Sequence, residues 1–283
     1  MGAEVLQPLV FFSMKENKYG KNVFVTGASS GIGKACAEYF AMMGCHVTGV
    51  SRHCEEGARD FEGGGSLVMK RLDITDEEKV RAFVKDLPGL DIAILCAGMG
   101  IAGPAETTPS SMTRKQMEVN YFGTVQTAQS CLTRMREHGK GLLLIIGSIA
   151  GRVSIPMQSQ YSASKYALEA FSDAVRMEMR DHGIRASIIE PGDTKTGFTA
   201  ARETLKEPGY NGIVEKSVAK MAKDEQEGRD PLSVAKVAWK LALRTEPPAR
   251  VPVGIEYKLL MFLLRLFPDR LKEFILRKMY LPS

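Results

Sequence analysis

Short apolar runs alternate with longer segments of helical periodicity along most of the chain. The runs are rich in Val, Ile and Leu without strict alternation, which is typical of parallel strands buried on both faces. The expected strands cover residues 22–26, 46–51, 67–72, 91–96, 142–147, 185–190 and 250–253. The expected helices cover residues 32–43, 76–86, 109–137, 160–181 and 230–244. This alternation predicts one doubly wound α/β domain with a sheet of about seven parallel strands flanked by helices.

Three segments fall outside the alternation and set the expected domain organisation. Residues 1–20 form an N-terminal extension, whose apolar run at 5–12 is too short for a spanning helix and lacks the flanks of a signal peptide. Residues 21–254 form the main domain, and within it the polar segment 196–229 is expected to hold two or three short helices that cover a cleft. Residues 255–283 form an amphipathic helical tail.

Composition and charge narrow the function classes. The chain has 283 residues and a formal net charge of +5. Residues 258–283 carry six basic and two acidic side chains, so the rest of the chain is nearly neutral and lacks the basic surface of a nucleic-acid-binding protein. The five scattered cysteines without a CxxC pair and the four separated histidines predict reduced thiols in the cytoplasm and no metal site.

A glycine-rich turn, TGASSGIG at residues 26–33, follows the first expected strand and opens the first expected helix. Glycines at such a junction let the backbone approach a pyrophosphate, and the helix N-terminus supplies N–H groups. Glycines alone also mark ordinary tight turns, but here both flanking elements are present. We therefore interpret this segment as a dinucleotide-binding turn. Its expected cofactor-binding residues are Gly27, Ser29, Ser30, Gly31, Ile32 and Gly33.

The end of the second expected strand bears on the choice of cofactor. An acidic residue at this place would bind the 2′-hydroxyl of NAD, whereas an arginine would accommodate the 2′-phosphate of NADP. The chain has Ser51 and Arg52 here, so NADP(H) is favoured over NAD(H), with a solvated surface arginine as the alternative interpretation. Asp73, at the end of the third expected strand, is expected near the adenine.

A second polar cluster can transfer a proton. Tyr161 and Lys165 are four residues apart on an expected helix and share one of its faces. An ammonium near a phenol favours the phenolate and lowers the tyrosine pKa from its usual value of about 10. Ser148 follows the buried strand 142–147, at the carboxyl edge of the sheet where ligands bind. Together with the glycine turn, the cluster predicts hydride transfer between a nicotinamide and a carbon that bears oxygen.

These motifs, in this order, resemble those of the short-chain dehydrogenase/reductase family over about residues 20–255. The resemblance rests on TGASSGIG, Asn120 in MEVNYFG, Ser148, YSASK at 161–165, and Pro191-Gly192 with the threonines that follow. It implies a single-domain Rossmann fold. It also implies that Tyr161 is the catalytic acid–base and that Ser148 orients the substrate oxygen. Lys165 would bind the nicotinamide ribose and lower the pKa of Tyr161, and Asn120 would hold a water.

The resemblance implies further cofactor contacts and an assembly. The residues expected near the nicotinamide and the phosphates are Pro191, Gly192, Thr194 and Thr196. The family's NNAG motif reads LCAG here, so Ala97 and Gly98 remain for the adenosine while both amides are lost. We interpret Cys96 of this motif as a small buried side chain. Family members form dimers and tetramers through the helices expected at 109–137 and 160–181, so a homodimer or homotetramer is expected.

The substrate is expected to be lipophilic. The loop after Ser148 contains Val153, Ile155 and Met157 and few charges, which favours an apolar ketone or alcohol over a sugar. The tail resembles, loosely, those of family members that act on steroids, retinoids or keto-lipids. Residues 257–281 could lie at an anionic membrane surface. The favoured interpretation is that the tail contacts protein instead: it packs on its own domain, covers the cleft or forms a dimer interface.

The sequence therefore predicts an NADP(H)-dependent oxidoreductase that acts on CH–OH groups and interconverts a lipophilic ketone and its secondary alcohol. A 3-keto-sphingoid-type lipid reductase is the first alternative. A non-catalytic dinucleotide sensor and a peripheral membrane protein are the others, and the presence of Ser148, Tyr161 and Lys165 argues against the sensor. The expected location is the cytoplasm, with membrane contact through the tail as the open question.

Overall fold

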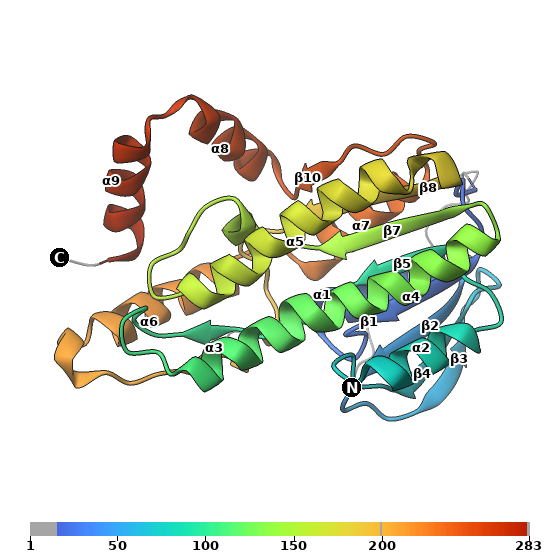
Figure 1. Ribbon diagram of the computed structural model, residues 1–283, viewed down its shortest axis with the longest axis horizontal. Helices are drawn as coiled ribbons and strands as arrows, with labels where there is room; N and C mark the ends of the chain where they lie inside the picture. The colour runs from blue at the N-terminus through green and yellow to red at the C-terminus, as the bar shows by residue number, and fades with distance from the viewer. Residues whose placement is uncertain (1–15, 199, 282–283) are drawn as a thin grey trace, which may run out of the picture.

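Eight strands form the central sheet of the computed structural model, which describes residues 16–198 and 200–281. The strand order is β10-β8-β7-β5-β1-β2-β4-β3 (Figure 1). The strands are β1 (Asn22–Thr26), β2 (His46–Ser51), β3 (Gly57–Asp60), β4 (Ser66–Arg71), β5 (Ile92–Leu95), β7 (Gly141–Ile146), β8 (Ile184–Glu190) and β10 (Arg250–Pro252). Neighbouring strands are parallel except β3 and β4. The doubly wound fold is confirmed, and the antiparallel edge strand β3 was not predicted.

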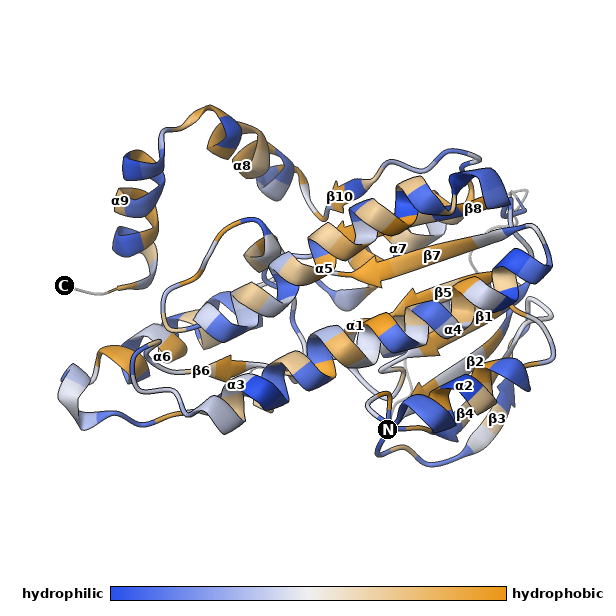
Figure 2. Cartoon of the chain, in the orientation of Figure 1, coloured by the Kyte–Doolittle hydropathy of each residue, from blue (hydrophilic) through white to orange (hydrophobic). Residues whose placement is uncertain are grey.

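Helices cover both faces of this sheet, and each face has its own apolar core (Figure 2). On one face lie α1 (Gly31–Met42) and α7 (Pro231–Ala242). On the other lie α2 (Glu77–Lys85), α4 (Gly123–Glu137) and α5 (Ser159–Glu178). Alternate side chains of a strand point to opposite faces, so Val23 and Val25 enter one core and Phe24 the other. Strands buried on both faces explain why the apolar runs do not alternate.

The long helix expected at 109–137 is interrupted. It consists of α3 (Ser110–Met117), a π-helical turn η1 (Glu118–Phe122), and α4. π-helical turns are rare and occur often at functional sites. This one carries Asn120, whose side chain is fully buried.

The segment 196–229 is joined to the body by a short pair of strands. Its β9 (Glu203–Thr204) pairs in parallel with β6 (Ile101–Ala102), which follows β5. The rest of the segment holds the 3₁₀ turn η4 (Pro208–Tyr210) and the helix α6 (Ile213–Gln226). Helical structure was predicted here, but the strand pair was not.

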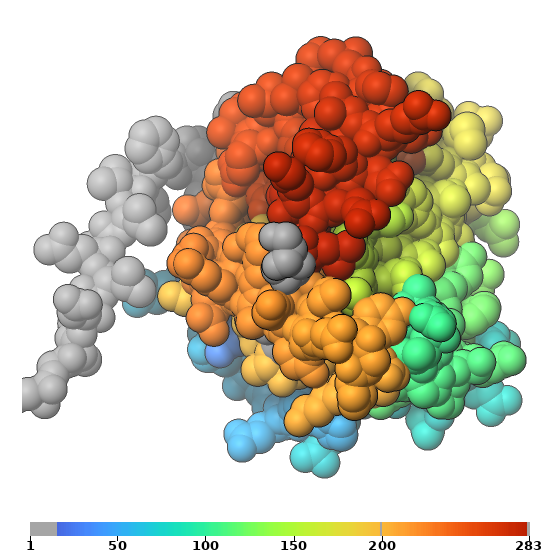
Figure 3. Space-filling model, turned by 90° about the vertical axis from the view of Figure 1, so that its left-hand side faces the viewer, coloured from blue at the N-terminus to red at the C-terminus, as the bar shows by residue number. Residues whose placement is uncertain are grey.

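The tail forms two helices, α8 (Ile255–Leu266) and α9 (Asp269–Tyr280). Figure 3 shows it in red beside the segment 196–229 in orange. The two are joined where the Ser217 hydroxyl of α6 donates to the Tyr280 carbonyl oxygen at 2.7 Å. Over the described ranges, no helix has the length and hydrophobicity needed to cross a membrane.

The described part of the N-terminal extension packs against the end of α7. The Lys18 N–H donates to the Ala242 carbonyl at 2.8 Å, and the Tyr19 side chain is buried. The apolar run at 5–12 lies outside the described residues. The remaining short turns are η2 (Ile149–Gly151) and η3 (Arg180–His182).

Candidate active site

The strand order reverses at the centre of the sheet, where β1 lies between β2 and β5. In open α/β sheets, ligands bind outside the carboxyl ends of the strands at such a point. The segments that leave this edge are the glycine turn after β1, residues 96–100 after β5, Ser148 with η2 after β7, and Pro191 after β8. Each contains residues that the sequence singled out, so the fold brings together motifs that are far apart along the chain.

The glycine turn is shaped by contacts that exclude larger side chains. A Cβ on Gly33 would lie 2.2 Å from the Gly27 carbonyl oxygen, so only glycine lets the first turn of α1 rest on the loop. Gly27 and Gly31 have φ angles of 68° and 53°, which favour glycine. Ser30 is the N-cap of α1 but makes no side-chain capping bond to its N–H groups. This backbone geometry fits a pyrophosphate group.

A groove of about 550 Å³ adjoins the start of α1. Gly31 and Thr196 both line it, and a Cβ on Gly31 would lie 3.3 Å from the Thr196 side chain. Two cationic side chains, Lys34 and Lys195, line it as well. The groove therefore combines the glycine turn with one of the threonines after Pro191.

The end of β2 lies against the same turn. The Ser29 hydroxyl donates to the Ser51 hydroxyl at 2.9 Å, and the Arg52 side chain next to them is exposed. Asp73 is turned toward its own loop, where its Oδ1 accepts from the Thr75 N–H and hydroxyl at 3.0 and 2.8 Å. Ser29, Ser51 and Arg52 are thus adjacent, while Asp73 caps its own turn.

Thr26 supports the loop in which the two amides are missing. Its Oγ1 accepts from the Cys96 N–H at 3.0 Å and from the Ala97 N–H at 3.2 Å. These bonds tie the end of β1 to the loop after β5. Burial raises the pKa of the Cys96 thiol well above its usual value of 9, and the neighbouring Cys36 adds to this effect, so Cys96 is a poor nucleophile at neutral pH.

Tyr161 and Lys165 lie on one face of α5, and Lys165 Nζ is 5.8 Å from the centroid of the Tyr161 ring. Burial raises the pKa of Tyr161 to about 12, against the opposing effect of a hydrogen bond with the Ser148 hydroxyl. Burial lowers the pKa of Lys165 to about 8. Lys165 Nζ donates to the Ile146 carbonyl at 3.0 Å. Burial therefore outweighs the other effects at both groups, and the lowering of the Tyr161 pKa by Lys165 stays a prediction.

Asn120 links the loop after β5 to α5. Its Oδ1 accepts from the Met99 N–H at 2.8 Å, and its Nδ2 donates to the Met99 carbonyl at 3.0 Å and to the Ser164 hydroxyl at 3.1 Å. A Cβ on Gly98 would lie 3.3 Å from Asn120 Oδ1 and 3.9 Å from Lys165 Nζ. Gly98, Asn120 and Lys165 therefore meet, and the polar bonds of Asn120 are made within the protein.

The loop after β8 is covered by the tail. A Cβ on Gly192 would lie 2.0 Å from the ring of Tyr257, a residue of α8. The Tyr257 hydroxyl accepts from the Asp193 N–H at 2.8 Å and donates to the Asp193 carboxylate at 2.7 Å. Within the loop, the Thr194 hydroxyl donates to the Gly192 carbonyl at 2.9 Å, and the Pro191 carbonyl accepts from the Ile149 N–H at 3.0 Å.

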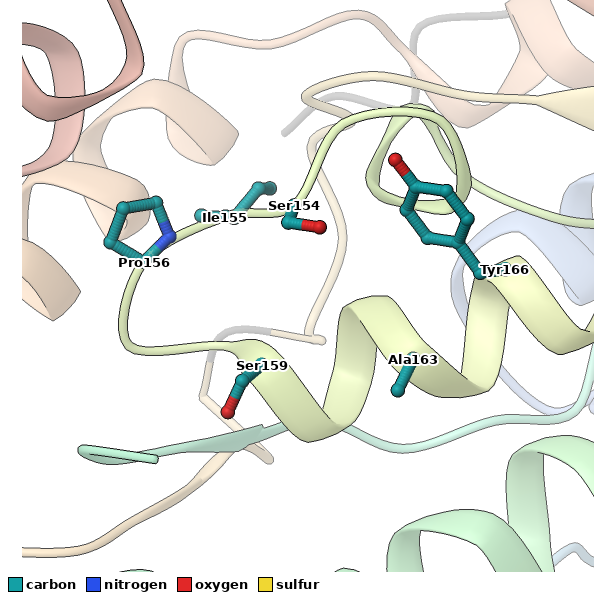
Figure 4. Close-up of a pocket in the computed structure, with 6 residues that line it drawn as sticks. All are labelled: Ser154, Ile155, Pro156, Ser159, Ala163 and Tyr166. Atoms are coloured by element: carbon teal, nitrogen blue, oxygen red, sulfur yellow. The ribbon is translucent and has the colours of Figure 1, made fainter. Parts of the chain in front are cut away.

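The three expected substrate residues have different surroundings. Ile155 lines a pocket of about 430 Å³ on the side of α5 that carries Ala163 and Tyr166 (Figure 4). None of Asn120, Ser148, Tyr161 or Lys165 lines that pocket, so it does not mark the reacting centre. Met157 has a φ of 62°, an uncommon conformation for a residue with a side chain, and its carbonyl accepts from the Gly103 N–H at 2.8 Å. Val153 is partly buried.

Sequence reasoning missed two side chains next to Tyr161. The Phe198 ring lies 5.7 Å from the Tyr161 ring, and the Arg202 guanidinium carbon lies 5.8 Å from the Phe198 ring. Arg202 is only 8% exposed. Both belong to the segment 196–229, and their place is set by the pairing of β9 with β6. No motif in the sequence signals it.

A doubly wound sheet with a glycine turn and a Ser–Tyr–Lys cluster at its carboxyl edge is the arrangement of a dinucleotide-dependent oxidoreductase. A family model described as short chain dehydrogenase matches residues 21–207. The chain belongs to this family, as the resemblance of its motifs implied, and it is an oxidoreductase.

Relatives and solved structures agree with this assignment. The chain is 33% identical over 267 residues to a 3-ketodihydrosphingosine reductase of Bacteroides thetaiotaomicron, a match that covers 91% of this chain and 97% of the relative. A short-chain dehydrogenase from Streptomyces avermitilis superposes with a TM-score of 0.77 at 26% identity, covering 91% of this chain and 95% of that one. ElxO with NADP bound superposes with a TM-score of 0.67 at 25% identity, covering 84% and 98%.

Proposed function

We propose that this protein is an NADP(H)-dependent reductase that converts a lipophilic ketone into its secondary alcohol, or carries out the reverse reaction. The observation that carries the proposal is the convergence of Tyr161, Ser148 and Lys165. Lys165 lies next to Gly98 of the loop after β5, and Ala97 of the same loop lies against Gly27 of the glycine turn. The similarity of the chain to a 3-ketodihydrosphingosine reductase supports a lipid ketone as substrate and favours a keto-lipid reductase over a non-catalytic sensor.

The protein's own groups suit a reduction. A bound nicotinamide would supply the hydride, with its pyrophosphate held at the turn of Gly27, Gly31 and Gly33. The Ser148 hydroxyl would orient the carbonyl oxygen of the substrate. Because the pKa of Tyr161 is about 12, its phenol keeps its proton at neutral pH and can donate it to the oxygen that becomes the alcohol. Lys165 would hold the ribose hydroxyls.

The preference for NADP(H) rests on the end of β2. Arg52 is exposed beside the hydrogen-bonded pair Ser29 and Ser51, where a 2′-phosphate would find a guanidinium and hydroxyl donors. ElxO, a structural neighbour at 25% identity, was crystallised with NADP. We expect Arg52→Ala to raise the Kd for NADPH about tenfold, which corresponds to about 1.4 kcal/mol of binding free energy. The Kd for NADH is expected to change by less than about twofold. Calorimetric titration of both cofactors measures this, and equal changes for both would contradict the preference.

Turnover is tested with wild type and Tyr161→Phe. The substrates are a series of straight-chain ketones of increasing length, assayed with NADPH and NADH. We expect activity to rise with chain length, NADPH to be the better cofactor, and Tyr161→Phe to abolish turnover while cofactor binding persists. Cofactor binding without turnover of any ketone would favour the non-catalytic sensor.

The tail offers a surface for lipid. Four side chains of α8 are 57–77% exposed and are spaced four, three and four residues apart, so they form one stripe. They are Ile255, Leu259, Phe262 and Leu266. Six basic side chains lie between residues 258 and 283. We propose that this stripe rests on an anionic membrane surface, where a lipophilic substrate would be found.

Co-sedimentation with vesicles tests the stripe. The pair Leu259→Glu and Phe262→Glu is expected to abolish binding to phosphatidylserine vesicles. Met177→Glu, at an even more exposed apolar side chain of α5, is the control and is expected to retain it. Binding that is unaffected by the pair would overturn the proposal, and loss of a dimer in the pair would identify the stripe as a subunit interface.

We also propose that the chain forms a homodimer or homotetramer through α4 and α5. Phe122, the last residue of η1 and the N-cap of α4, is 51% exposed, and Tyr166 of α5 is 42% exposed. Analytical ultracentrifugation of wild type and of Phe122→Glu with Tyr166→Glu tests this. A monomeric wild type would contradict the proposal.

A further inference from the structure

Arg202 and Glu225 form a buried ion pair within the segment 196–229. The Arg202 side chain is 2% exposed and that of Glu225 is 15% exposed. Arg202 Nη2 donates to Glu225 Oε1, which joins the residue before β9 to the end of α6. The pair lies on the substrate side of the site, separate from Asn120, Ser148 and Lys165.

Two polar atoms of this pair lack a partner. Arg202 Nη1 and Glu225 Oε2 are buried and make no hydrogen bond to any part of residues 16–198 and 200–281. The other nitrogens of the guanidinium have partners: Nη2 bonds Glu225, and once the oxygen and nitrogen of the Gln158 amide are exchanged, its oxygen accepts from Nε at 3.1 Å and from Nη2 at 3.2 Å. Leaving a buried donor or acceptor without a bond costs about 1–3 kcal/mol. A water molecule or a ligand group that reaches them would remove this cost.

The pair lies close to the reacting centre. The Phe198 ring centroid is 5.7 Å from that of the Tyr161 ring and 5.8 Å from the Arg202 guanidinium carbon. The charge of Arg202 lowers the pKa of Tyr161 and that of Glu225 raises it, so both charges act at the Tyr161 hydroxyl. Phe198 therefore lies next to both Tyr161 and Arg202, and a substrate that extends from Tyr161 along the Phe198 ring would approach the pair.

We infer that Arg202 and Glu225 form a specificity subsite for a hydroxyl group that the substrate carries close to its carbonyl. This inference rests on the proposed ketone reduction. A hydroxyl can accept from Arg202 Nη1 and donate to Glu225 Oε2, which satisfies both atoms without adding charge. A carboxylate, which only accepts, could bond Arg202 Nη1 but would be repelled by Glu225 Oε2, and an ammonium group, which only donates, could bond Oε2 but would be repelled by Arg202. An alkyl chain would leave both atoms unbonded. The substrate class is therefore a hydroxyketone with a long apolar chain.

Two substrates of equal chain length test the subsite: a 1-hydroxy-2-alkanone and the corresponding 2-alkanone. Wild type is expected to favour the hydroxyketone in kcat/KM by about 10- to 100-fold, the range that one or two hydrogen bonds to a buried charged pair provide. In the double variant Arg202→Leu with Glu225→Leu, the ratio is expected to fall to about one. Replacing both partners avoids leaving one buried charge alone.

A second ion pair supplies the matched control. Arg229 Nε and Nη2 donate to the Glu256 carboxylate at 2.5 and 2.7 Å, which joins the segment 196–229 to α8 at the surface. The variant Arg229→Leu with Glu256→Leu is expected to keep the wild-type ratio. If it lost the ratio as well, the effect would come from a loosened segment, and the subsite would be refuted.

The outcomes separate this inference from the proposed function. If wild type reduces both ketones equally well, the subsite is wrong and the reductase stands. If wild type reduces neither, the reductase fails, and calorimetric binding of the two ketones decides the subsite. A tighter Kd for the hydroxyketone that disappears in Arg202→Leu with Glu225→Leu would support the subsite, and equal Kd values would overturn it.

Discussion

The two sides of the site are built in different ways. On the cofactor side, Gly33, Asn120 and Lys165 are positioned by regular elements and by bonds to the backbone. On the substrate side, Phe198 and Arg202 come from an irregular segment that is held by the two-residue pairing of β9 with β6 and by side-chain contacts. The residues proposed for catalysis are thus fixed by the sheet and the helices packed on it, while those proposed to meet the substrate belong to a segment with few regular contacts to the sheet.

This difference predicts separate kinetic effects. Tyr161→Phe removes the proposed proton donor and is expected to abolish detectable turnover, which corresponds to a fall in kcat of about 10²- to 10⁴-fold or more. Phe198→Ala removes only a wall beside Tyr161 and is expected to raise KM while kcat falls less than about tenfold. Steady-state kinetics with a long-chain ketone measures both. A loss of kcat in Phe198→Ala as large as that in Tyr161→Phe would break the comparison.

Stability is expected to depend strongly on the cofactor side. Gly33→Ala places a methyl group 2.2 Å from the Gly27 carbonyl oxygen, and relieving the overlap is expected to cost about 1–3 kcal/mol of unfolding free energy and to weaken cofactor binding. Gly57→Ala in β3 is the matched control, because nothing lies within 4 Å of its Cβ position. Urea unfolding measures both, and equal stability of the two variants would contradict the steric argument.

A pH effect sharpens the comparison, since it originates on the helix that carries Tyr161. Burial raises the pKa of Glu169 to about 7, and the Glu190 charge adds to this, whereas Arg250 and Arg152 oppose it. Because the pKa of Glu169 is higher in the folded protein than in the unfolded chain, protonated Glu169 contributes to the unfolding free energy. This contribution is complete below about pH 4.5 and is lost as the pH rises through 7. The unfolding free energy of wild type is therefore expected to fall between pH 5 and pH 8.

Glu169→Gln is expected to flatten this fall by about 1–3 kcal/mol, since one pKa unit corresponds to about 1.4 kcal/mol. Glu178→Gln, at an exposed carboxyl at the end of the same helix, is the control and is expected to keep the wild-type dependence. Denaturant unfolding at several pH values measures the difference. If Glu169→Gln retained the full pH dependence of the unfolding free energy, that dependence would come from other titrating groups.

The sequence predicted the cofactor side far better than the substrate side, for a physical reason. Every expected strand is present with its ends within one residue, because buried parallel strands are contiguous apolar runs. Since Ser148 follows a strand end, it could be placed at the carboxyl edge, and the family resemblance added Tyr161 and Pro191 to the same site. The π-helical turn at Asn120, the burial that raises the Tyr161 pKa, and Arg202 could not, because they depend on packing between segments distant along the chain.

The contact between Tyr257 and Gly192 has a thermodynamic consequence. Tyr257 holds the loop after β8 with its ring on Gly192 and its hydroxyl on Asp193, so any ligand that shifts this loop must also do work on α8. Coupling of this kind is reciprocal. If a ligand at the loop changes the free energy of docking α8 by some amount, docking of α8 changes the binding free energy of that ligand by the same amount. Binding of a ligand at the loop after β8 and docking of the tail are then described by a single linked equilibrium.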